Sequence, residues 1–218
     1  FDTSLCTKIK NKHDVSVSRI EHLMAAFSAL SIDNAVIKIN NSELPALDGS
    51  SYEYVKKLMM AGINIQYASK SYIKVLRKIK VKDGDRYISI SPSNDLTIDI
   101  TIDYPDTIIG KSQFHYSHSR ENFIADLSEA RTYTFFENIK KMRTAGLAMG
   151  GNLNNALVVD KFKILNPDGL RFEKEFVKHK TLDCIGDFYL LGMPLIGKVD
   201  CFAPGHKLNQ MLVKEILK

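Results

Sequence analysis

The sequence contains no tryptophan and only three cysteines among its 218 residues. Cys6, Cys184 and Cys201 are too few and too widely spaced to form a disulfide framework or a four-thiolate zinc site, and they suit a reducing compartment. No apolar stretch approaches the ~20 residues that a membrane-spanning helix needs. These absences argue against a disulfide-stabilised secreted protein and against a membrane-spanning one. We therefore expect a soluble, cytoplasmic protein.

Charge of neither sign dominates, because 30 Lys and Arg residues oppose 25 Asp and Glu residues and leave a formal net charge of +5. A positive balance suits anionic partners such as nucleic acids or phosphorylated metabolites. However, over residues 74–82 lysines alternate with apolar residues, so the lysines would lie on one face of a strand and the apolar residues on the other. This pattern is typical of a half-buried strand with a solvated face. The positive charge makes a non-enzymatic nucleic-acid-binding α+β module the alternative function. Because the lysines fit a solvated strand face, however, no nucleic-acid partner is expected.

The pattern of apolar residues predicts a chain that mixes helices and strands. Helices are expected over residues 18–30, 51–61, 119–126, 136–144, 173–191 and 204–217. Strands are expected over residues 34–39, 74–82, 96–104 and 130–133. The polar stretch from Gln66 to Ser71 is typical of a linker. We therefore predict an α+β chain of two small domains, over residues 1–67 and 72–218.

One local arrangement of polar residues is unusual. His179, Asp183 and Asp187 stand four residues apart within a predicted helix. Because positions i and i+4 lie on one face of a helix, His179 and Asp183 can bind one metal ion together. Asp187 lies one turn further along, where it can orient a histidine. The simpler interpretation is an exposed helix with an ion pair between Lys180 and Asp183, which are also correctly spaced.

Two more histidines stand where helices are expected to begin. Glu21 and His22 are adjacent near the start of an apolar-faced helix, and a histidine beside a carboxylate can supply a zinc ligand and a general base. His206 stands at the start of the last helix and can act as a general acid. Simpler interpretations remain open: Glu21 can close a capping box with Ser18, and both histidines can be solvated residues of a first turn.

Taken together, these residues meet the requirements of a hydrolytic zinc site. Two histidines and one aspartate leave one coordination position of zinc open for water. Zinc lowers the pKa of that water to about 7, a nearby carboxylate can take its proton, and a histidine can protonate the leaving amine. The spacing alone leaves open whether segments so far apart in the chain meet in space.

A set of short motifs is similar to those of one known family. In chain order they are IEHL at 20–23, the residues Asp33, Asn34 and Ala35, LDGS at 47–50, ARTY at 130–133, GLAMGG at 146–151, NPDGLR at 166–171, HKTLDCIGD at 179–187 and GHKLN at 205–209. Each motif is weak alone, but their order along almost the whole chain is specific. The chain resembles the zinc-dependent UDP-3-O-acyl-N-acetylglucosamine deacetylases, which act early in lipid A synthesis in Gram-negative bacteria.

The resemblance implies roles for particular residues. Three residues would bind the zinc ion: His22, His179 and Asp183. Glu21 would be the general base that activates the zinc-bound water. His206, positioned by Asp187, would protonate the departing amine. Thr132 would help to hold the oxyanion of the tetrahedral intermediate, and Lys180 would contribute positive charge near the substrate.

The resemblance also implies a fold and a partner. Two similar α/β-sandwich domains would pack face to face with the site between them, and an insert near residues 146–172 would form a hydrophobic passage for the fatty acyl chain. The apolar residues of this insert are equally consistent with ordinary core: Leu147, Met149, Leu153, Ala156 and Val158. Family members carry further residues before the stretch that matches Phe1, so the first domain is expected to be incomplete in this chain. The substrate would be a UDP-linked acylated glucosamine and the protein a monomer.

Overall fold

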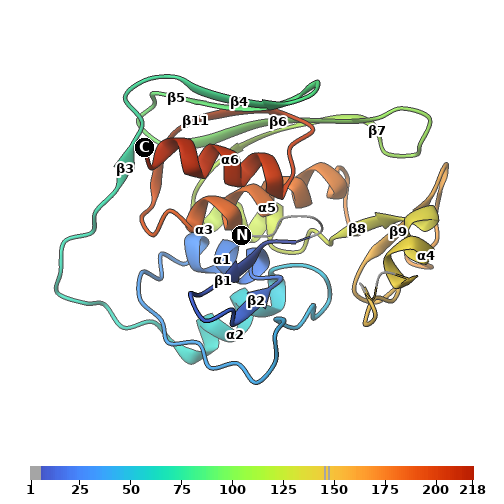
Figure 1. Ribbon diagram of the computed structural model, residues 1–218, viewed down its shortest axis with the longest axis horizontal. Coiled ribbons are helices and arrows are strands. Elements are labelled where there is room, and N and C mark those ends of the chain that lie inside the picture. Colours follow the sequence, from blue (N-terminus) through green and yellow to red (C-terminus); the bar gives the residue numbers. More distant parts are fainter. Residues whose placement is uncertain (1–5, 145, 147) are drawn as a thin grey trace.

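A large sheet and the helices beside it form the main layers of an α+β fold. The computed structural model describes residues 6–144, 146 and 148–218. Within these residues the sheet has six strands: β3 (Ile73–Lys74), β4 (Ile79–Asp83), β5 (Arg86–Ser91), β6 (Leu96–Tyr104), β7 (Gly110–Ser117) and β11 (Leu195–Phe202). Their order is β4-β5-β11-β6-β7, with β3 paired to β11. Helices α5 (Glu175–Tyr189) and α6 (His206–Ile216) lie along one face of this sheet (Figure 1).

Strand β6 shows how the apolar pattern places the core. It spans Leu96–Tyr104, the predicted range. Ile98, Ile100 and Ile102 are buried, while the intervening residues are only partly buried. Each fully buried isoleucine stabilises the fold by about 1.5–3 kcal/mol. The alternation therefore fixes which face of the sheet receives the helices, and the predicted strand is confirmed.

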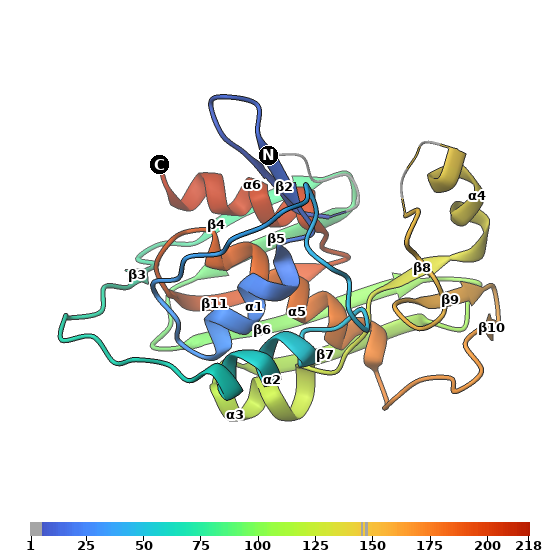
Figure 2. The ribbon, with the colours of Figure 1, turned by 90° about the horizontal axis from the view of Figure 1, so that it is seen from below.

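Helices α1 (Glu21–Ala29) and α5 cross at very close range (Figure 2). The contact point is Gly186 of α5, where an added Cβ would overlap the backbone carbonyl oxygen of Glu21. Glu21 and His22 open α1, and His179 and Asp183 lie on α5 before Gly186. The absence of a side chain at Gly186 therefore lets the two predicted metal-binding segments meet.

Replacing Gly186 with alanine is expected to push α1 away from α5. The obstacle is backbone, which cannot give way as the end of a flexible side chain can. We expect the free energy of unfolding to fall by about 1–3 kcal/mol, as for other overpacked sites. Urea unfolding measures this change. Gly150→Ala is the matched control, because a Cβ there would meet no atom within 4 Å; equal stability of the two variants would contradict the close crossing.

The segment around α1 departs from the prediction at two places. Strand β2 (Ser16–Ser18) pairs with β1 (Lys8–Lys10), and Arg19 takes a left-handed backbone conformation with φ 59° before α1 begins at Glu21. Ser18 is therefore part of a strand, and the predicted capping box is wrong. The strand predicted over 34–39 is also wrong, because no strand of the described chain pairs with these exposed residues. Their apolar content alone cannot replace the hydrogen bonds of a neighbouring strand.

Most other elements lie within a few residues of their predicted positions. Helix α2 (Tyr52–Ala61) ends at Gly62, as predicted, where φ is 81°. The predicted strand over 74–82 is divided between β3 and β4. The helix predicted over 119–126 consists of α3 (Arg120–Asn122) and the π-helical turn η1 (Phe123–Leu127). The strand predicted over 130–133 begins only at its last residue, as β8 (Tyr133–Phe135).

A small lobe stands beside the main sheet. It consists of β8, β9 (Leu157–Asp160) and β10 (Lys163–Ile164), with α4 (Phe136–Thr144) next to them (Figure 2). Within the insert, Val158 belongs to the buried core, whereas Met149 and Leu153 are exposed. Leu147 lies outside the described residues. A passage for an acyl chain therefore stays a prediction.

The hydrophobic core continues across the predicted linker. One cluster contains Ala25 and Val55, which precede the linker, together with Ile88 and Leu182, which follow it. The division into domains over 1–67 and 72–218 stays a prediction, and residues 1–5 lie outside the described part. Among the helices that the structure describes, none is long and apolar enough to cross a membrane.

Candidate active site

Three buried side chains converge between α1 and α5. Nε2 of His22 lies 3.6 Å and Nε2 of His179 lies 3.3 Å from Oδ1 of Asp183. One ligand atom from each residue lies within 4.8 Å of the other two. Among the described residues, Oδ1 of Asp183 is buried with no hydrogen-bond donor. A buried carboxylate oxygen is costly without a partner, and a metal cation held with the two imidazoles would satisfy it. These residues fit a metal site.

A hydrogen bond determines which nitrogen of His179 faces the site. Nδ1 donates to the backbone carbonyl of Ala130 at 2.9 Å, so Nε2 is left to face Asp183. Burial lowers the pKa of His179 to about 3, although the charge of Asp183 acts in the opposite direction. The imidazole is therefore neutral near pH 7, which is the form that binds metals.

Glu21 and His206 face one another beside these three residues. Oε1 of Glu21 lies 3.9 Å from Nε2 of His206, and Nδ1 of His206 donates to Oδ2 of Asp187 at 2.8 Å. Burial lowers the pKa of His206, but the charges of Asp187, Asp183 and Glu21 outweigh burial and raise this pKa to about 9. Burial raises the pKa of Glu21, which makes its carboxylate a stronger base. A group able to accept a proton and a group able to donate one therefore flank the candidate metal site.

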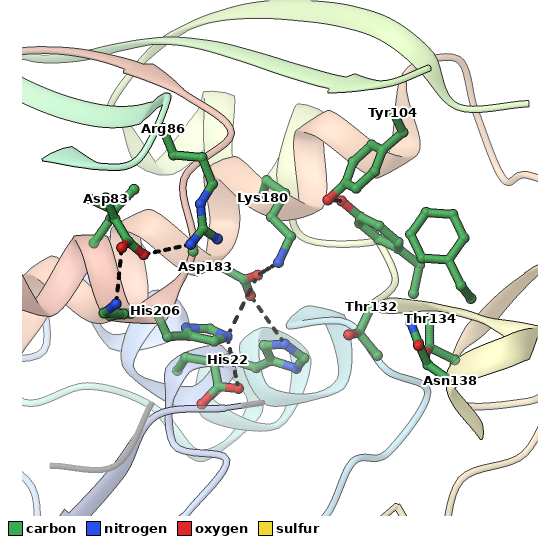
Figure 3. A pocket seen from close by; sticks show the side chains of 16 residues that line it. His22, Asp83, Arg86, Tyr104, Thr132, Thr134, Asn138, Lys180, Asp183 and His206 are labelled. Carbon is green, nitrogen blue, oxygen red and sulfur yellow. Dashed lines mark hydrogen bonds and ion pairs between the residues drawn. The ribbon is translucent and has the colours of Figure 1, made fainter. Parts of the chain in front are cut away.

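A cavity of about 710 Å³ opens over these groups. Figure 3 shows Asp183 surrounded by His22, His206 and Lys180, all of which line the cavity. Nζ of Lys180 donates to Oδ2 of Asp183 at 2.9 Å. Burial raises the pKa of Asp183, but the positive charges of Lys180 and His206 help to hold it well below its usual value, so the carboxylate stays charged. Its charge is available to a cation.

The structure brings the predicted site residues into one region. Thr132 lines the same cavity as Lys180, and its backbone N–H donates to the carbonyl of Gly49 at 2.8 Å. Asp187 lies behind His206 and does not line the cavity. The simpler interpretations are wrong in placing these side chains at the surface, because the exposed fraction is 4% for His22 and 2% for Asp183. His206 is largely buried as well. The ion pair expected between Lys180 and Asp183 is present, at 2.9 Å.

Two residues that the sequence analysis did not single out complete the site. Thr7 and Asn209 both donate to Asp187, Thr7 to Oδ1 and Asn209 to Oδ2. Asn209 stands three residues after His206 on α6, so helical spacing offered a signal for it. Thr7 is separated from Asp187 by 180 residues and belongs to no spacing pattern. Only the folded chain reveals its position.

Comparison with known proteins gives the family. The LpxC family model, described as UDP-3-O-acyl N-acetylglycosamine deacetylase, matches residues 1–218. This chain belongs to that family. It is 44% identical over 217 residues to the UDP-3-O-acyl-N-acetylglucosamine deacetylase of a Nitratiruptor species, covering 100% of this chain and 72% of the relative. It is 42% identical over 218 residues to the enzyme of the same name from Shewanella violacea, covering 99% of this chain and 71% of the relative.

Membership of the deacetylase family bears on the alternative function. The lysines over 74–82 are exposed, as the solvated face of a strand requires. The family therefore favours the hydrolase over the nucleic-acid-binding module.

Proposed function

We propose that the protein is a zinc-dependent hydrolase that removes the N-acetyl group from UDP-3-O-acyl-N-acetylglucosamine in lipid A synthesis. The convergence of His22, His179 and Asp183 beside a cavity carries this proposal. Two histidines and one carboxylate are a common ligand set of catalytic zinc, and the names of the relatives supply the substrate. We infer a cytoplasmic location from the family and from the three unpaired cysteines.

Two residues beside the metal site would carry the proton transfers. Zinc bound there would act as a Lewis acid and make a water molecule acidic enough to attack at neutral pH. Glu21 would accept the proton of the attacking water. His206 would donate a proton from Nε2 to the departing amine nitrogen, while Asp187 holds its ring through Nδ1. The 3.9 Å between Glu21 and His206 would let both act on one amide group.

Lys180 and Thr132 would stabilise the negative charge that develops on the amide oxygen. Both line the cavity, and Lys180 is a half-buried cation, so water screens its charge only in part. The cavity wall also contains Arg86 and Lys207. Both pair with Asp83, at 2.5 and 3.1 Å. Their positive charges suit the diphosphate of a UDP-linked sugar.

The proposed reaction is tested by following acetate release. The protein is incubated with UDP-3-O-acyl-N-acetylglucosamine, and acetate and the free amine are measured by mass spectrometry. We expect one acetate for each amine formed. Absence of acetate from a folded, metal-loaded protein would contradict the proposal. Salt-sensitive retention of RNA or DNA on a filter, without acetate release, would support the nucleic-acid-binding alternative instead.

A further inference from the structure

Thr7 connects the two residues that would move protons. We propose that Thr7 is a positioning residue, which holds the general base Glu21 with its backbone and the aspartate behind the general acid His206 with its hydroxyl. This inference rests on the proposed function, because it assigns Thr7 to the same reaction. The residue lies immediately before β1 and is fully buried.

The backbone of Thr7 fixes the carboxylate of Glu21. The N–H of Thr7 donates to Oε2 of Glu21 at 3.0 Å. The carbonyl of Thr7 accepts a hydrogen bond from the N–H of Ile20 at 3.4 Å, which ties the same segment to the start of α1. With Oε2 held in this way, Oε1 is the oxygen directed toward His206. One oxygen of the base is therefore anchored, and the other faces the site.

The hydroxyl of Thr7 fixes the carboxylate of Asp187. It donates to Oδ1 of Asp187 and lies 3.3 Å from Nδ1 of His206. Oδ2 of Asp187 accepts from His206 at 2.8 Å and from Asn209 at 2.7 Å. Both oxygens of this buried carboxylate are thus held. Because the Asp187 carboxylate holds the imidazole of His206, rotation of the carboxylate would turn the ring that donates the proton.

The location of Thr7 suits a residue that positions the proton-transferring groups and does not bind the substrate or the metal. Thr7 is absent from the cavity wall, so it is not expected to touch the substrate. The partners of its hydroxyl are Asp187 and His206, and neither belongs to the group formed by His22, His179 and Asp183. Loss of the hydroxyl should therefore lower kcat while KM and the metal content stay close to those of the wild type.

The test compares the Thr7→Val and Thr7→Ser variants of the full-length protein. Valine keeps the shape and the backbone N–H but removes the hydroxyl, whereas serine retains the hydroxyl. We expect kcat for acetate release to fall by about 10- to 100-fold in Thr7→Val, the range found for outer-shell partners, and to recover in Thr7→Ser. Thr181→Val is the matched control, because the buried hydroxyl of Thr181 donates only to the backbone carbonyl of Val177 on its own helix.

Each outcome decides the question. Normal kcat in Thr7→Val would overturn the inference, as would an equal loss in Thr181→Val. If Thr7→Val fails to fold, Thr7→Ala is measured with the same expectation, and loss of metal or of the fold in both would show a purely structural role and overturn the inference. A wild-type protein without acetate release would instead overturn the proposed function, and the role of Thr7 with it.

Discussion

Glu21→Gln is expected to lower kcat for acetate release by about 10²- to 10⁴-fold, the usual contribution of a general base. Glutamine has the shape of glutamate, and its amide oxygen can still accept the N–H of Thr7, which lies 3.0 Å from Oε2 of Glu21. The amide cannot take a proton from water. The variant should therefore keep its fold and its metal while losing turnover, which initial rates and elemental analysis together measure.

Glu53→Gln is the matched control for this substitution. Glu53 lies on α2 and pairs only loosely with Lys57, at 4.0 Å, on the surface. We expect this variant to turn over substrate at the wild-type rate. If Glu21→Gln retained turnover within about twofold of the wild type, another group would have to be the base.

His179→Ala is expected to release the metal and to lower turnover by more than ~100-fold, beyond the usual effect of losing an outer-shell partner. The substitution removes one of three ligand side chains, and it leaves the carbonyl of Ala130 without the donor that it has in the wild type. Two remaining ligands bind zinc poorly, since catalytic sites normally retain three. Metal content per chain and acetate release are measured on the same preparation.

His115→Ala provides the comparison. His115 is an exposed histidine on β7 that pairs with Asp99 at the surface. We expect its removal to change neither the metal content nor the rate. A His179→Ala variant that still held one metal ion per chain would place the metal elsewhere.

The sequence predicts those features that arise within one element. The alternation of apolar and polar residues over 96–104 predicts the bounds of β6, because the residues of a strand with one buried face point alternately to the core and to the other face. Likewise, the four-residue spacing of His179 and Asp183 predicts a shared face of α5, and the structure places their ligand atoms 3.3 Å apart. In both cases local geometry determines the outcome.

Features that depend on distant segments could not be predicted in this way. The apolar residues over 34–39 favour a strand, but a strand forms only beside a neighbour, and the described chain supplies none there. Burial of Glu21 results from its contacts with Thr7 and α5, so the local capping-box pattern was misleading. Thr7 itself carries no local signal. The monomeric state and the acyl passage stay predictions.

The measurement that tests the central claim most directly is acetate release by the metal-free protein during titration with zinc. Chelation should abolish the release of acetate from UDP-3-O-acyl-N-acetylglucosamine. Added zinc should restore it, with the rate reaching its plateau near one equivalent per chain, because His22, His179 and Asp183 form a single site. Full turnover by protein from which the metal has been removed would contradict the account.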